Sequence, residues 1–186
     1  MPPKVRITKE LIVTTALDLV RKEGPQSLNA RNLALALSCS TQPIFSNFAT
    51  MEDLRDAVSK QGEILFNEFV AREMSTGLYP EYKAYGMAYI RFAKEERELF
   101  KLFFMCDRFG EPVPEDASLT LKMEGLVQDN TGLNTTDSKL FHLEMWMYVH
   151  GIATLFATGF LDLDWELVGK MITDSYQGLR KQYGKE

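Results

Sequence analysis

The chain has 186 residues, of which 45% are hydrophobic and 25% are charged, and its formal net charge is -5. This length and composition are those of a folded globular protein with one or two domains, and they exclude disordered, collagen-like and disulfide-scaffold classes. A sequence pI of about 5.2 also argues against a protein that coats nucleic acid without specificity, because such binding needs many cations facing phosphates.

The expected compartment follows from the cysteines and the apolar segments. Neither Cys39 nor Cys106 lies in a CxxC motif or a Cys/His cluster, and the N-terminal segment lacks the uninterrupted apolar core of a secretory signal. Residues 145–161 carry no formal charge, but their length is the lower limit for a bilayer span and acids flank them. We therefore expect a cytoplasmic protein with no membrane span, in which 145–161 is a buried helix.

Apolar residues recur at intervals of three and four, and no run alternates as a strand would, so an all-α fold of about nine helices is predicted. The first helix is predicted at about 8–23, where Gly24 and Pro25 stop it. A second helix follows with Ser27 as its cap, and a short third helix begins with Ser40 as its cap.

A fourth, long helix is predicted from the cap Thr50 to about residue 74, with Asp53 as its capping-box partner. Further helices are predicted at about 80–93, 95–108, 115–129, 136–160 and 164–183. Helix 95–108 is apolar nearly all round, so it should be central and buried.

Three short helices within the first fifty residues, the second and third joined by three or four residues, have the layout of a helix-turn-helix DNA reader. The exposed start of the third helix would then enter a major groove, where hydroxyl and amide groups bond to phosphates or base edges. Any small helical bundle can also have three helices with polar faces, so the layout alone leaves both interpretations open.

From Ala30 to Leu54 the sequence ARNLALALSCSTQPIFSNFATMEDL resembles the DNA-binding signature of the tetracycline-repressor (TetR) family. The residues in register with the family's core and cap positions are Leu33, Ala34, Leu37, Ser40, Ile44, Phe48 and Leu54. The resemblance covers about the first 60 residues. It implies a three-helix DNA-binding domain at 1–50 and, at 51–186, a helical bundle that binds a small effector and forms a homodimer.

Five positions depart from the family pattern. Ser38 stands in the turn where glycine is usual, and Cys39 replaces a valine. Phe45, Asn47 and Met51 stand where a tyrosine, a histidine and a lysine usually contact phosphates. Fewer cationic phosphate contacts predict weaker binding with a shallower salt dependence. Phe45, which has no hydroxyl, is expected to pack under the third helix rather than touch DNA.

The expected DNA contacts are Ser40, Thr41, Gln42 and Asn47, with Lys4, Arg6, Arg31 and Thr50 as supporting phosphate contacts. The charge distribution agrees with this placement. Residues 1–50 carry six Lys and Arg against three Asp and Glu, a net charge of +3, which leaves -8 for residues 51–186. A mildly basic segment 1–50 beside an acidic segment 51–186 favours oriented, site-specific binding to DNA over non-specific binding along it.

The segment MWMYVHGIATL, Met145 to Leu155, resembles the W-x-x-x-H-G motif of one class of TetR C-terminal domains. A glycine there lets a partner helix approach closely, and the last helix adds an apolar stripe. The expected dimer-interface residues are Gly151, Thr154, Thr158, Val168, Met171, Ile172, Ser175 and Leu179. The alternative is that both helices only close the core of the monomer.

An effector cavity is expected from the aromatic residues and nine methionines, which can line an adaptable apolar site with one or two polar anchors. The expected effector contacts are Tyr89, Phe92, Phe103, Trp146, Met147 and His150. Aromatics at helical spacing more often belong to a core, which is the alternative. His142 is expected to face solvent.

These features together predict a homodimeric repressor of transcription that binds a double-stranded, pseudo-palindromic operator and is released by a small apolar or amphipathic effector. One alternative is a helical ligand- or protein-binding module that has lost DNA binding. An enzyme is not expected, because the chain has two histidines and none of the common catalytic motifs. No cofactor or metal site is expected either.

Overall fold

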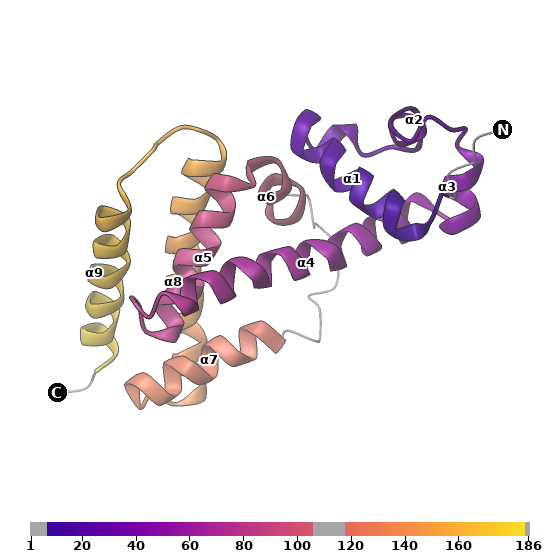
Figure 1. Ribbon diagram of the computed structural model, residues 1–186. Helices are drawn as coiled ribbons and strands as arrows, with labels where there is room; N and C mark the ends of the chain where they lie inside the picture. Colours follow the sequence, from indigo (N-terminus) through magenta and orange to yellow (C-terminus); the bar gives the residue numbers. More distant parts are fainter. Residues whose placement is uncertain (1–6, 106–117, 185–186) are drawn as a thin grey trace. The chain divides into compact units, whose positions relative to one another are not determined.

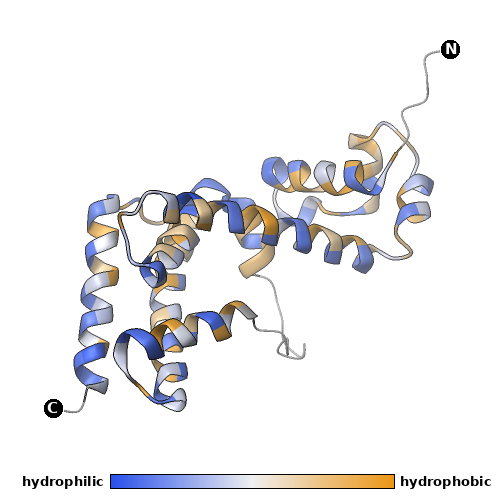
Figure 2. Cartoon of the chain, turned by 60° about the horizontal axis from the view of Figure 1, so that its bottom comes forward, coloured by the Kyte–Doolittle hydropathy of each residue, from blue (hydrophilic) through white to orange (hydrophobic). Residues whose placement is uncertain are grey.

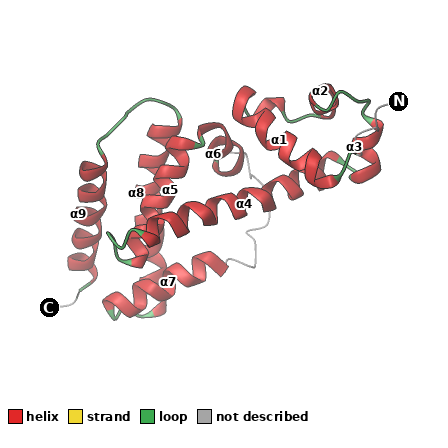
Figure 3. Ribbon diagram, viewed as in Figure 1, coloured by secondary structure: helices red, strands yellow, loops and turns green. Residues whose placement is uncertain are grey.

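A computed structural model of the chain describes residues 7–105 and 118–184 (Figure 1). Within these ranges the regular secondary structure is entirely helical (Figure 3), with nine α-helices and one short 3-10 helix. The prediction of an all-α fold with about nine helices is confirmed.

The described residues form two compact units. Unit 1 comprises residues 7–67 and 95–105, and unit 2 comprises residues 68–94 and 118–184. The long helix α4, Met51–Ser75, contributes to both units. These units are defined by how the helices pack. The boundary expected at residue 50 instead separates DNA binding from effector binding and dimerisation, and that division of function stays a prediction.

Unit 1 contains α1 (Lys9–Glu23), a 3-10 helix (Pro25–Ser27), α2 (Ala30–Ala36), α3 (Gln42–Asn47), the first part of α4, and α6 (Arg97–Phe104). α1 ends at Gly24, whose φ of 86° is in the region that favours glycine. α4 begins with the predicted capping box, because the N–H of Asp53 donates to Thr50 Oγ1 and the N–H of Thr50 donates to Asp53 Oδ2.

Two predicted caps are wrong. Asn29, not Ser27, caps α2, because its Oδ1 accepts a backbone N–H of the first turn at 3.0 Å. Ser27 lies in the 3-10 helix, where its hydroxyl donates to a backbone carbonyl at 2.6 Å. α3 begins after Thr41 rather than after Ser40. In both cases the cap lies one or two residues further along the chain than the sequence pattern indicates.

The core of unit 1 is built from helices that lie far apart in the sequence, since α1 packs against both α2 and α6. Its fully buried side chains include Ile12, Val20, Leu33, Ile44 and Phe100. At the edge of this core Arg21 Nε of α1 pairs with Glu96 Oε2 at 2.9 Å. α6 is less buried than expected, because Phe104 is 36% exposed.

A glycine in the middle of α4 makes room for an aromatic ring from α6, because the ring of Phe103 occupies the position that a side chain at Gly62 would need. We expect Gly62→Ala to lower the free energy of unfolding by about 1–3 kcal/mol, since the ring must leave a packed site. Urea unfolding measures this change.

The matched control is Gly125→Ala in α7 (Ser118–Thr131), where a new methyl group meets no atom of the described residues within 4 Å apart from its chain neighbours and its own helix backbone. This variant should gain up to about 1 kcal/mol from the higher helix propensity of alanine. An equal gain at Gly62 would contradict the packing described for Phe103.

Unit 2 contains the end of α4, α5 (Glu81–Glu95), α7, α8 (Thr135–Ala157) and α9 (Trp165–Tyr183). Asn134 caps α8 and Asp164 caps α9, each through a side-chain oxygen that accepts a backbone N–H. α8 packs against both α7 and α9. The buried core of this unit includes Met87, Ile90, Phe92, Phe141, Phe156 and Val168.

Residues 145–161 do not form the fully buried helix that was expected. α8 ends at Ala157, and only one side of it is covered, so that Met145 is 2% exposed but Met147 is 57% exposed. Among the helices that the structure describes, none has both the length and the hydropathy needed to cross a bilayer.

Candidate functional site

The outward face of α3 is the surface that the sequence assigns to DNA contact. α3 turns Ile44 into the core of unit 1, and Phe48 follows it there at the end of the helix. Gln42, Phe45 and Ser46 remain exposed, and because they lie at i, i+3 and i+4 they share one face of the helix.

The turn between α2 and α3 requires an unusual backbone conformation. Ser38 has a φ of 51°, in the left-handed region that favours glycine. The next residue closes the turn, because the N–H of Cys39 donates to Ala34 O at 2.9 Å. The geometry explains why glycine is usual at this position of the TetR pattern, and serine adopts it at a cost of about 1 kcal/mol.

The expected DNA contacts differ in how accessible their side chains are. Ser40, Gln42 and Arg31 are exposed, and Thr41 is half-buried. Lys4 and Arg6 lie outside the described residues. The accessible members therefore lie at the start of α3 and on α2.

Two expected contacts are engaged within the fold. Asn47 Nδ2 donates to Pro43 O at 2.8 Å and to Ile7 O at 3.4 Å, which ties the end of α3 to the residue before the N-cap of α1. The Thr50 hydroxyl bonds to Asp53 Oδ2 at 2.9 Å as part of the cap of α4. Asn47 therefore braces α3, and Thr50 caps α4.

The expectation for Phe45 is wrong. Its side chain is 47% exposed, whereas Phe48 is 5% exposed and fills the core. One aromatic residue suffices for the inner side of so short a helix, and Phe45 lies one position beyond the buried Ile44 on the turn that faces outward.

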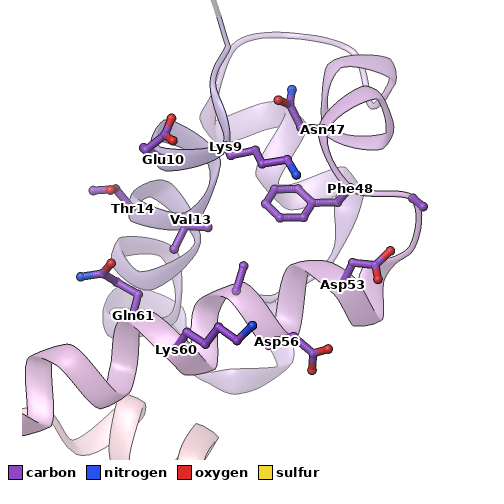
Figure 4. A pocket seen from close by; sticks show the side chains of 12 residues that line it. Lys9, Glu10, Val13, Thr14, Asn47, Phe48, Asp53, Asp56, Lys60 and Gln61 are labelled. Atoms are coloured by element: carbon purple, nitrogen blue, oxygen red, sulfur yellow. The ribbon is translucent and has the colours of Figure 1, made fainter.

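An open groove of about 720 Å³ lies within unit 1, between α1 and the start of α4 (Figure 4). Lys9 Nζ lies 5.4 Å from the centroid of the Phe48 ring at this groove. The lining carries both signs of charge, from Lys9, Lys60, Glu10, Asp53 and Asp56. The groove shares no residue with the expected effector contacts.

Three of the expected effector contacts meet in unit 2. Tyr89 Oη lies 2.9 Å from His150 Nδ1, and the indole of Trp146 stacks on the imidazole of His150 with ring centroids 5.1 Å apart. Tyr89 is 9% exposed and Trp146 is 44% exposed, so this cluster runs from the core of the unit to its surface.

The other three expected effector contacts lie apart from that cluster. Phe92 is fully buried and packs edge-on against Phe69, with centroids 5.2 Å apart. Met147 is mostly exposed, and Phe103 belongs to α6 in unit 1. Phe92 is therefore a core residue, which was the alternative for the aromatics of α5.

His142 does not face solvent as expected. Its Nδ1 lies 3.0 Å from Tyr82 Oη, and the two rings meet edge-on with centroids 5.9 Å apart. Burial lowers the pKa of His142, against a smaller opposing effect from the Glu124 carboxylate. Burial likewise lowers the pKa of His150 and raises the pKa of Tyr82.

These two histidines predict a pH dependence of stability. Because both pKa values are lower in the folded protein than the ordinary value of about 6.5, the unfolded chain takes up protons first as the pH falls. The free energy of unfolding should therefore be highest above about pH 7 and decline towards about pH 5.5. Urea unfolding at several pH values measures the slope, and the His142→Gln/His150→Gln variant should give a flatter profile. An equally steep profile in that variant would assign the effect to other groups.

The expected dimer-interface residues lie on both sides of α8 and α9. Gly151 and Thr158 are exposed, and Thr154, Met171, Ser175 and Leu179 are half-buried. Val168 and Ile172 are 0% and 3% exposed, because α9 turns them into the core of unit 2. Within the single chain these two side chains are core residues, as the alternative expected, and the assignment of the set to an interface stays a prediction.

An apolar surface runs along the uncovered side of α8. Its large members are 44–57% exposed: Leu140, Leu143, Trp146 and Met147. Gly151, Thr154 and Thr158 continue it as small residues, and we call these seven residues the α8 stripe. α9 adds Leu167, 45% exposed, although Figure 2 shows blue and pale residues along much of α9. The spacing of three and four from Leu140 onward is visible in the sequence.

A buried ion pair in unit 2 was not predicted. Glu73 near the end of α4 is 4% exposed and pairs with Arg91 of α5, whose guanidinium carbon lies 4.1 Å from the ring centroid of Trp165. Glu73 Oε2 is buried without a hydrogen-bond partner among the described residues. The sequence contains one indication of this burial. Glu73 lies four residues after Phe69 and three after Val70, so it shares the side of α4 that these buried residues occupy.

Comparison with known proteins places the chain in a family. Residues 82–174, half of the chain, match the family model described as tetracyclin repressor-like, C-terminal domain. A search of curated proteins finds no relative that matches. A solved TetR-like transcriptional regulator from Rhodococcus sp. RHA1 is similar over 100% of both chains, with a TM-score of 0.71 and 16% identity.

Two further solved structures share the fold. A protein of unknown function from Rhodococcus sp. RHA1 has a TM-score of 0.69 and 21% identity over 100% of both chains. A putative TetR family transcriptional regulator from Vibrio parahaemolyticus has a TM-score of 0.58 and 15% identity, over 89% of this chain and 95% of that one. With the family model matching half of the sequence, the chain belongs to the tetracycline-repressor-like (TetR) family of transcriptional regulators.

Proposed function

We propose that this protein is a homodimeric, DNA-binding transcriptional repressor that acts in the cytoplasm and is released from its operator by a small apolar or amphipathic effector. The observation that carries the proposal is the helix-turn-helix of unit 1, in which α3 is supported from inside by Ile44 and presents Gln42, Phe45 and Ser46 outward. Membership of a family of transcriptional regulators supports the same role.

In this proposal the start of α3 enters the major groove of the operator. Ser40, Thr41 and Gln42 carry hydroxyl and amide groups that can bond to base edges and phosphates, and Arg31 faces a phosphate from α2. Asn47 and Thr50 act through the fold, since their side chains brace α3 and cap α4.

Two copies of the chain would be joined through the α8 stripe and the adjoining surface of α9. Exposed apolar side chains in a continuous row are costly in water. A Cβ at Gly151 would meet no side chain of the described residues within 4 Å, which leaves room for a second helix. A two-fold dimer would present two α3 helices to a pseudo-palindromic operator.

Release from DNA would follow from a change in the distance between the α3 helices of the two subunits. Two recognition helices on one face of a duplex must lie about one helical turn, roughly 34 Å, apart. An effector that prefers another separation lowers operator affinity. α4 takes part in both units and so provides a direct mechanical link, and the Tyr89–His150 pair offers polar anchors for an effector in unit 2.

Electrophoretic mobility shifts with the DNA upstream of the chain's own gene test the proposal. A shift at low salt that weakens on addition of salt is expected, because phosphate contacts release counterions. A confirmed, folded dimer that shifts no duplex at low salt would contradict operator binding and favour a ligand- or protein-binding module.

We expect Gln42→Ala to weaken operator binding by about tenfold, because one amide that reads a base edge is lost. Thermal unfolding should be unchanged, since Gln42 is exposed. Gln177→Ala removes an exposed glutamine from α9 and should leave the affinity unchanged. Equal affinities for both variants would show that Gln42 does not contact the operator.

A further inference from the structure

Phe45 places an apolar ring on the face of α3 that is proposed to bind DNA. Phe45 is 47% exposed and lies on the face of α3 that also carries Gln42 and Ser46. A phenyl ring has no group that can donate a hydrogen bond to a phosphate, so its contribution to binding must come from short-range apolar contact.

The polar side chains around Phe45 are mostly engaged already. The Ser46 hydroxyl donates to Gln42 O at 2.9 Å, and the Asn47 amide donates to two backbone carbonyls. The side chain of Gln42 is exposed and makes no hydrogen bond among the described residues. The outward face of α3 therefore offers a base one free amide and, one turn further along, one apolar ring.

The charge of unit 1 gives little electrostatic attraction to DNA. Residues 1–67 and 95–106 contain ten Lys and Arg and ten Asp and Glu, a net charge of 0. With no excess of cations, attraction to the phosphate backbone is weak, and the affinity for a chosen site must depend more on contacts at base edges.

The major groove presents one prominent apolar group, the 5-methyl of thymine, and phenylalanine is among the side chains that contact it. We propose that Phe45 is a specificity-determining residue that packs on the 5-methyl group of a thymine in each operator half-site. Gln42 reads a neighbouring base, and an amide suits adenine through N6 and N7. This inference rests on the proposed function of the chain as an operator-binding protein.

The test begins with a duplex selected from random sequences by the full-length dimer. Each thymine is then replaced singly by deoxyuridine, which removes only the methyl group, and the Kd is measured by fluorescence anisotropy at one salt concentration. One thymine per half-site should raise the Kd by about three- to tenfold on replacement, the effect of losing one buried methyl contact.

Phe45→Ala should weaken binding to the thymine duplex and abolish the difference between thymine and deoxyuridine at that position, as a double-mutant cycle between two contacting groups requires. Phe45→Leu, which keeps an apolar side chain, should retain part of the difference. Ser46→Ala changes the neighbouring exposed residue and should retain all of it.

The outcomes separate this inference from the function on which it rests. Specific binding with no thymine sensitive to deoxyuridine, or a difference that persists in Phe45→Ala, overturns the role of Phe45 and leaves the operator-binding function intact. Failure to select any duplex overturns both. If Phe45→Ala does not fold, a scan of the unaltered protein without a sensitive thymine still overturns the role of Phe45, and Phe45→Leu still tests whether a sensitive thymine senses this side chain.

Discussion

Replacing Arg91 with methionine is expected to lower the free energy of unfolding by about 3–5 kcal/mol, because it leaves the carboxylate of Glu73 buried without its partner. Glu73 is 4% exposed, and the side chain of Arg91 is 24% exposed. A carboxylate at this depth has no access to water that could replace the guanidinium. Urea unfolding, followed by circular dichroism, measures the loss.

Two matched variants identify the cause. Glu73→Gln/Arg91→Met leaves no buried charge, so much of the lost stability should return. What remains missing combines the lost contact between the guanidinium and Trp165 of α9, worth about 0.5–2 kcal/mol, with the cost of a buried amide at position 73. Arg97→Met removes an exposed arginine at the start of α6 and should change stability by no more than about 0.5 kcal/mol. A loss below about 1 kcal/mol in Arg91→Met would show that the pair is not the support described.

Replacing Met147 with glutamate is expected to convert the proposed dimer into a monomer. Met147 is 57% exposed at the centre of the α8 stripe, next to Trp146. A carboxylate there would be desolvated without a partner in an apolar interface, a cost that an exposed position in the monomer does not impose. Light scattering after size-exclusion chromatography measures the change in mass.

The same variant should bind the operator at least about 100-fold more weakly, because a monomer loses the second half-site and the avidity that comes with it. Its circular dichroism spectrum should be unchanged, since the substituted side chain is not part of the core of unit 2. Asn67→Glu adds the same charge at an exposed position of α4 and should remain dimeric. A Met147→Glu protein that stays dimeric would place the interface elsewhere.

Local features of the fold could be predicted from the sequence. The C-terminal end of α1 follows from Gly24, and the capping box of α4 follows from Thr50 and Asp53, which lie within one turn of each other. The all-helical class follows from apolar spacing in the same way. The missed caps of α2 and α3 show the limit of such reasoning, because serine, threonine and asparagine all suit a cap and neighbouring candidates compete.

The candidate site was only partly predictable. The position of α3 and the exposure of Gln42 followed from the pattern, whereas the exposure of Phe45 did not. A six-residue helix has room for few inward positions, and Ile44 and Phe48 fill them. Which apolar residues of α3 are buried depends on how α1 and α2 pack around it. Those contacts come from other parts of the chain, so the sequence of α3 alone does not reveal them.

The sequence by itself determined that this chain is all-helical, where most of its helices lie and that a short outward helix follows a tight turn, because periodicity and capping act within a few residues. Only the tertiary structure decided which side of each helix is covered. It paired Glu73 with Arg91 and Tyr82 with His142, and it buried Val168 while leaving Met147 exposed. The reason is physical: burial is set by contacts between helices that are distant in the chain, and an apolar stripe has the same pattern whether its own unit or another molecule covers it.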